Sequence, residues 1–174
     1  MTEAMAPLHQ HLQPLDLPLN QIYLDPNNPR FTDSDWTYVS TENWDKSDVQ
    51  VAAHRRLIAD FDVEKLRMSM EVNGFLPIDR VIVKHFADNK YIVLEGNRRI
   101  GAAKLIGQHA IDGSPVSPAV LDSLTSIPCL LYTGTDGDAA WIFQGLRHIS
   151  GVAEWSAFNK AKLLVEQMEK DSLT

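Results

Sequence analysis

Apolar residues recur at helical spacing in several parts of the chain, and turn or capping residues stand at the ends of these parts. Val63, Leu66 and Met70 share one face of a segment that Gly74 ends. A longer stripe, with apolar residues three or four positions apart, runs over residues 139–149. The predicted helices cover residues 48–60, 63–73, 97–106 and 139–150, and a last helix begins near Ser156.

Short runs rich in β-branched and aromatic residues predict strands where turn residues bound them. These runs lie at residues 21–24, 80–84, 91–94 and 127–132. A turn at 87–89 joins the second run to the third, and Gly96 ends the third. Together these elements predict an α+β fold. We expect a small mixed sheet of about four strands with helices packed against it and a helical extension at the C-terminus.

Proline, glycine and polar residues divide the chain into one domain and less regular parts. Pro7, Pro14 and Pro18 forbid a regular helix near the N-terminus, so that segment is predicted to be an arm. The C-terminal helix is either a natural end or the start of a further region. The predicted parts are an arm at 1–19, a domain at 20–150 with insertions at 32–56 and 108–125, and the C-terminal helix at 151–174.

The charge balance bears on the class of partner. The 174 residues include 16 Lys and Arg against 23 Asp and Glu, a net charge of −7. A free-standing nucleic-acid binder usually has the opposite balance. Contact with DNA would therefore need additional basic regions or a partner chain. No apolar run approaches the length of a membrane span, and no secretory signal precedes the domain.

The single cysteine, Cys129, excludes an internal disulfide and a cysteine-based zinc cluster. A reducing cytoplasm is the expected compartment. Cys129 lies in the middle of an apolar strand, so we expect it to be a small buried hydrophobic residue.

The stretch at 91–107 carries the most informative chemistry. A strand runs into Glu95-Gly96 and then directly into a helix, whose first backbone N–H groups have no helical partner. Arg98 and Arg99 stand in the first turn, where cations oppose the helix dipole. A bound phosphate would explain both arginines. The other interpretation is that they pair with acidic neighbours or point to water, and the residues alone leave both open.

Five motifs follow one another over residues 20–170. They are Ile22-Tyr-Leu-Asp-Pro-Asn-Asn-Pro-Arg30, a helix with Gly and Pro-Ile at 63–78, Gly96-Asn-Arg-Arg-Ile-Gly-Ala102, Ile127-Pro-Cys-Leu-Leu131 and Gly145-Leu-Arg-His-Ile-Ser150. Their order resembles the ParB/sulfiredoxin fold, in particular the N-terminal domain of ParB-type partition proteins. The sulfiredoxin branch is set aside, because Asn97 occupies the place of its cysteine.

The resemblance implies a pocket for a nucleoside triphosphate, ATP or CTP, with Mg²⁺. Residues of the Gly96 turn would hold the phosphates, and Gly74 and Pro77 would border the base. Three further residues share a helix face by their spacing and would close the pocket. The predicted phosphate-binding residues are Gly96, Asn97, Arg98, Arg99, Gln144, Arg147 and His148.

Three departures from the family's pattern affect catalysis. Asn97 stands where partition proteins have a Glu linked to hydrolysis, and Arg147-His148 stand where they have a Glu-Asn pair for magnesium. Gly101 stands in place of a third Arg. Glu95 is the carboxylate that adjoins the turn and is the candidate catalytic residue. We therefore expect slow hydrolysis or none, dependent on Glu95.

Three hypotheses follow. The first is a nucleotide-binding domain, with or without NTP hydrolysis, that acts in a DNA-related process as a monomer or homodimer. The second is a non-catalytic interaction domain in which the pocket serves a ligand switch. The third is a ParB-like nuclease with a carboxylate metal site at Asp25, Asp79 and Glu95. Trp36 and Trp44 either stack on a base or a partner, or cover an edge of the core.

Overall fold

The computed structural model describes residues 7–31, 37–78, 80–135, 137 and 139–149. Of Leu8 and residues 147–149 it describes the backbone alone. The predicted last helix and the C-terminal part at 151–174 lie outside the described residues, as do Trp36 and Asp79.

One five-stranded mixed sheet organises the described chain, with the strand order β1-β5-β3-β4-β2. The pairs β1–β5 and β3–β4 are antiparallel, and the pairs β2–β4 and β3–β5 are parallel. The strands are β1 (Leu12–Leu17), β2 (Ile22–Tyr23), β3 (Val81–Ala87), β4 (Lys90–Glu95) and β5 (Ile127–Tyr132). The α+β class is confirmed, and each of the four predicted strands is present.

The fifth strand, β1, lies within the predicted N-terminal arm, so the arm prediction is wrong for residues 12–17. β1 is an edge strand that pairs with β5 alone, and Pro14 is tolerated there because one side of an edge strand needs no N–H donor. Leu15 packs against the core and Leu17 is 4% exposed. Alternating leucines therefore attach this segment to the sheet although its prolines forbid a helix.

Five α-helices complete the described fold. They are α1 (Ser47–Asp60), α2 (Val63–Asn73), α3 (Asn97–Ile111), α4 (Pro118–Ser123) and α5 (Ala139–Ile149). Two of them extend into the predicted insertions: α1 begins at Ser47, inside the segment 32–56, and α4 lies inside 108–125. The insertions are therefore only partly irregular.

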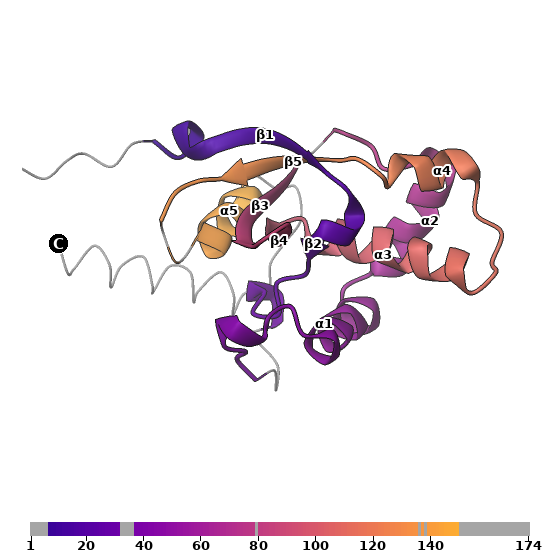
Figure 1. Cartoon of the computed structure of the whole chain (residues 1–174), viewed down its shortest axis with the longest axis horizontal. Coiled ribbons are helices and arrows are strands. Elements are labelled where there is room, and N and C mark those ends of the chain that lie inside the picture. The colour runs from indigo at the N-terminus through magenta and orange to yellow at the C-terminus, as the bar shows by residue number, and fades with distance from the viewer. Residues whose placement is uncertain (1–6, 32–36, 79, 136, 138, 150–174) are drawn as a thin grey trace, which may run out of the picture.

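The two faces of the sheet are covered by different helices. Val81, Val83 and Val93 point to the face where α1 to α4 bury their apolar side chains. Alternate residues point to the other face, where Leu94 packs with Tyr132 and with Phe143 of α5. Figure 1 shows α2, α3 and α4 grouped at the right of the view and α5 among the strands at the left. Cys129 is fully buried on the first face, as predicted, and burial raises the pKa of its thiol to about 12.

Candidate functional site

The junction of β4 and α3 is a sharp turn at Gly96. This residue has φ +107° and ψ 16° and precedes α3 without any side-chain cap. A Cβ at Gly96 would lie 3.1 Å from Val81 Cγ2 and 3.1 Å from Arg99 Nη2. The turn therefore requires glycine both for its backbone conformation and for space. Among the residues that the structure describes, no side chain caps the first N–H groups of this 15-residue helix.

We expect Gly96→Ala to lower the free energy of unfolding by roughly 1–3 kcal/mol, because alanine is strained at this φ. Gly107→Ala is the matched control in the same helix, since no atom lies within 4 Å of the Cβ it would add. That control should stabilise the chain by about 0.5–1 kcal/mol. Chemical denaturation of both variants is the measurement. Equal stability of the two variants would contradict the requirement for glycine at position 96.

Asn97, the first residue of α3, is 3% exposed, and its side chain makes one hydrogen bond with the described residues. Its Oδ1 accepts the backbone N–H of Asp25 at 2.9 Å, and this bond fixes which end of the amide is the oxygen. Its Nδ2 is buried with no hydrogen-bond partner in the described part of the chain. Buried donors are nearly always paired, so this one is suited to an acceptor oxygen brought by a ligand.

The parallel pairing of β2 with β4 explains why Asp25 meets Asn97. Parallel neighbours end at the same edge of a sheet, so the residues that follow β2 and β4 lie side by side. Asp25 is 6% exposed, and its Oδ1 accepts the N–H of Asn27 at 2.8 Å. Burial raises the pKa of this carboxyl from 3.8 to about 7, and the hydrogen bond from Asn27 opposes that rise.

Both predicted arginines are held against the protein. Arg99 Nη2 lies 3.1 Å from Glu95 Oε2, with the two side chains 19% and 12% exposed. Arg98 Nε donates to the carbonyl oxygen of Phe61 at 2.6 Å. Its two terminal nitrogens have no partner among the described residues. Arg99 thus pairs with an acidic neighbour, as one interpretation of the sequence expected, whereas Arg98 keeps donors for a ligand.

The other predicted site residues lie on α5, at the end of α2 and in the link from α2 to β3. Gln144 is 4% exposed, and its Nε2 donates to the carbonyl of Leu94 at 2.9 Å, which ties α5 to β4. The side chains of Arg147 and His148 lie outside the described residues. Gly74 ends α2 and lies beside Ser123 of α4. Pro77 instead lines a cavity of about 360 Å³ together with Glu95.

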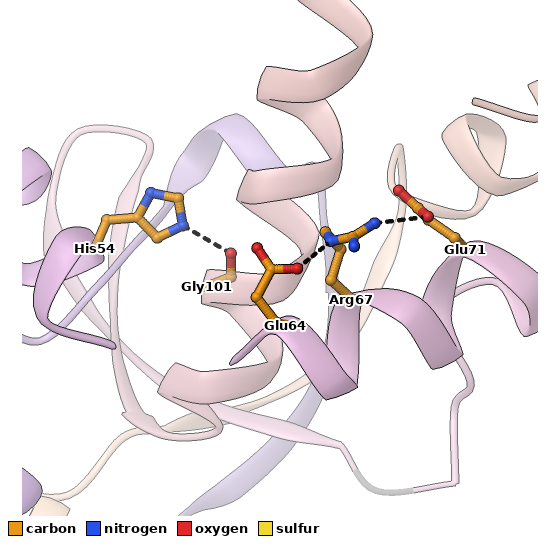
Figure 2. A network of polar contacts seen from close by, with 5 residues as sticks. All are labelled: His54, Glu64, Arg67, Glu71 and Gly101. Carbon is orange, nitrogen blue, oxygen red and sulfur yellow. Dashed lines mark hydrogen bonds and ion pairs between the residues drawn. The ribbon is translucent and has the colours of Figure 1, made fainter. Parts of the chain in front are cut away.

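Gly101 has a packing role where the family's pattern has an arginine. His54 of α1 places its Nε2 2.8 Å from the carbonyl oxygen of Gly101, as Figure 2 shows. A Cβ at Gly101 would lie 3.3 Å from Leu57 Cδ1. Burial lowers the pKa of His54, so the neutral ring is favoured. The neighbouring ion pairs of Arg67 with Glu64 and Glu71, both 2.7 Å, brace the exposed side of α2.

A larger cavity, of about 800 Å³, opens beside Asp25 on the face of the sheet that α5 covers. Asp25-Pro-Asn-Asn-Pro belongs to the first sequence motif, but no pattern in the sequence predicted that this segment lines a cavity. The cavity's other walls come from β3, β4, the segment 38–44 and the start of α5, which are far apart in sequence. Its lining residues are Asp25, Asn27, Asn28, Phe31, Tyr38, Thr41, Trp44, Lys84, His85, Phe86, Ile92, Leu94, Gly137, Ala139, Ala140 and Trp141.

The described residues include no group of three His, Cys, Asp or Glu side chains able to hold a metal ion. Asp79, one of the three residues of the predicted carboxylate site, lies outside them. Within the same described ranges, no helix combines the length and the apolar composition needed to cross a membrane.

Comparison with known proteins finds one kind of likeness. No family model matches the chain, and no curated protein matches it. Among solved structures, it is similar to a C-terminally truncated chromosome-partitioning protein ParB from Caulobacter crescentus, complexed with CTP-gamma-S. The match has 17% sequence identity and a TM-score of 0.47, and it covers 90% of this chain and 65% of the ParB chain. The chain thus spans less than two thirds of the length of the matched protein.

Proposed function

We propose that this chain binds a nucleoside triphosphate whose phosphates lie at the N-terminus of α3. The observation that carries the proposal is the Asn97 amide, whose Nδ2 is buried beside the first turn of the helix without an acceptor among the described residues. A phosphate oxygen is the acceptor that suits a helix N-terminus, because the backbone N–H groups and the dipole there also favour an anion.

The charges around the turn support the same ligand. Arg98 supplies two terminal nitrogens that the described protein does not use. Arg99 lies beside Gly96, with its Nη2 3.1 Å from the position that a Cβ there would take. Guanidinium groups form charge-assisted, often bidentate hydrogen bonds with phosphates. In the proposal Gly96, Asn97, Arg98 and Arg99 hold the phosphates, and Mg²⁺ arrives as the counter-ion of the triphosphate.

The geometry favours binding over rapid hydrolysis. Glu95, the candidate catalytic carboxylate, is engaged with Arg99 at 3.1 Å, and Asn97 cannot accept a proton near neutral pH. Neither residue is poised to deprotonate or orient a water molecule. A ligand switch, in which bound nucleotide changes the conformation or the partner of the domain, is therefore the second candidate function. A DNA-related cytoplasmic role would involve further regions or chains, given the net charge of −7.

The direct test is a thermal-shift panel of ATP, CTP, GTP and ADP, each with and without Mg²⁺. A ligand present at about 100 times its dissociation constant adds roughly 2.7 kcal/mol of stability. Isothermal titration of the best ligand then compares the parent with Arg98→Ala. We expect Arg98→Ala to weaken binding roughly 10- to 100-fold, because lost charge-assisted hydrogen bonds cost about 1.5–3 kcal/mol.

Arg55→Ala is the matched control, because Arg55 is an exposed arginine on α1. It should bind the nucleotide as the parent does. If no nucleotide shifts the melting temperature, the proposed function is wrong. If Arg98→Ala and Arg55→Ala both bind like the parent, the phosphates do not lie at this turn.

Hydrolysis is expected to be slow or absent. Steady-state phosphate release, measured at saturating nucleotide, should stay near background for the parent and should not exceed it in Glu95→Gln. Asn97→Glu should raise the rate if a missing carboxylate is the limit. Robust release that survives Glu95→Gln would contradict the role given to Glu95.

A further inference from the structure

The cavity of about 800 Å³ is walled by aromatic rings from separate elements. Trp44 comes from the segment before α1, Phe86 from β3 and Trp141 from α5. The rings of Trp44 and Phe86 stack, with centroids 5.9 Å apart and planes at 26°. Phe31, 1% exposed, forms the base of the wall next to Asp25. The cavity's volume lies in the range of about 300–1,000 Å³ that is typical of small-molecule sites.

Specific hydrogen bonds hold the segment that closes this cavity. Asn27 exchanges two hydrogen bonds with the backbone of Val39, its Nδ2 donating to the carbonyl at 2.7 Å and its Oδ1 accepting the N–H at 2.8 Å. Trp44 Nε1 donates to the same carbonyl at 3.0 Å. Gln50 Nε2 donates to the carbonyl of Trp44 at 2.8 Å. The aromatic wall is therefore held in place by the protein itself, which favours a preformed site.

An ion pair adds to this fastening on the outer side. Lys90 Nζ lies 2.6 Å from Asp45 Oδ2 and 5.9 Å from the ring centre of Tyr23. The segment is thus joined to β4 next to Trp44, the residue whose ring stacks on Phe86. An insertion that only covered a core edge would not need to hold a cavity of this size open beneath it.

Two buried polar side chains lie in the same wall. Asp25 uses Oδ1 for the N–H of Asn27, and its Oδ2 has no partner among the described residues. Asn28 is 1% exposed and uses Oδ1 for the N–H of Arg30 at 3.0 Å. Lys84 and His85, both on β3, add an amine and an imidazole side chain to the lining of the cavity. A few polar groups set in an aromatic wall are the pattern by which proteins bind planar, hydrogen-bonding ligands.

We propose that this cavity binds the planar heteroaromatic base of the nucleotide, with the aromatic rings against the base and Asp25 and Asn28 on its hydrogen-bonding edge. The inference rests on the proposed function, because Asp25 joins the two places: it lines the cavity and donates its N–H to Asn97 at 2.9 Å. In this proposal the base does not lie at Gly74 and Pro77, where the resemblance to the family would place it. The specificity of the site then depends on the segment 37–46 of this chain.

The test separates the base from the phosphates by using each alone. Adenosine, cytidine, guanosine and uridine probe the cavity, and tripolyphosphate probes the α3 turn, all by isothermal titration. Asp25→Asn removes the carboxyl at constant volume, and Thr41→Trp fills the rim from an exposed position. The matched controls are Asp48→Asn and Met68→Trp. Asp48 lies in the first turn of α1, and Met68 of α2 is 60% exposed.

We expect at least one nucleoside to bind the parent, and both cavity variants to weaken that binding tenfold or more. Tripolyphosphate affinity should stay within twofold in these variants, and the controls should bind both probes normally. Nucleosides that fail to bind at millimolar concentration, or that bind both cavity variants like the parent, would overturn the assignment of the base. If the parent binds a nucleoside but not tripolyphosphate, the phosphate site at the α3 turn is wrong instead.

The last titration uses a single-stranded oligonucleotide as the ligand, because a nucleic-acid strand presents the same bases. The net charge of −7 favours the free nucleotide. We expect the oligonucleotide to bind more weakly than the matching triphosphate. Tighter binding of the oligonucleotide would overturn the assignment to a free nucleotide.

Discussion

Asp25→Asn is expected to make the protein more stable than the parent at pH 8, by up to roughly 4 kcal/mol. Burial raises the pKa of Asp25 from 3.8 to about 7, so folding must remove a charged carboxylate from water at pH 8. Below pH 3.8 the carboxyl is protonated in both the folded and unfolded states, and this cost is absent. As the pH rises from 3.8 through about 7, the unfolded chain releases the proton first, so Asp25 lowers the stability of the fold over that window.

The measurement is chemical denaturation of the parent and Asp25→Asn at several pH values between 4 and 8. The difference in unfolding free energy should be small at the acid end and should grow toward pH 8. Asp48→Asn, an exposed acidic position, should show no such growth. A parent that is the more stable of the two at pH 8 would show that Asp25 is stabilised as an anion.

Phe31→Ala is expected to lower the free energy of unfolding by roughly 3–5 kcal/mol, the usual cost of truncating a buried aromatic residue. Phe31 is 1% exposed, and its ring lies 5.8 Å from that of Phe61 in the link between α1 and α2. Tyr38→Ala is the control on the same cavity wall, because Tyr38 is 75% exposed. Tyr38→Ala should change the free energy of unfolding by no more than about 0.5 kcal/mol. Urea denaturation of both variants checks the prediction, and equal losses would mean that Phe31 does not anchor the turn.

Local patterns predicted most of the elements because each has its own signal. The strand at Ile127–Tyr132 and the start of α3 after Gly96 follow from β-branched runs and from a glycine at a turn. β1 was missed because Pro14 lies within it and Pro18 follows it, whereas its pairing with β5 depends on a segment more than 100 residues away. Helix α3 runs on to Ile111, past the predicted end at residue 106, because Gly107 is tolerated inside a helix that packs along the core.

The candidate site was predictable only in part. The Gly96 turn and its arginines were found from sequence, since an arginine in the first turn of a helix needs an explanation. Asn97 was placed in the site, but its hydrogen bond with Asp25 depends on the parallel pairing of β2 and β4, which no local pattern shows. The aromatic cavity has the same origin: Trp44, Phe86 and Trp141 come together through the sheet and α5. Local sequence patterns do not predict that residues so far apart in the chain line one cavity.

Phosphate binding at the α3 turn is tested most directly by an amide NMR spectrum of the isotopically labelled chain, recorded as tripolyphosphate or the best nucleoside triphosphate is added. We expect the side-chain amide of Asn97 and the backbone amides of residues 97–99 to shift most, because their N–H groups would donate to the phosphate oxygens. Side-chain amides elsewhere, such as that of Asn73 on the exposed end of α2, should not move. If the ligand binds while the Asn97 side-chain amide stays unchanged, the phosphates do not lie at the α3 turn.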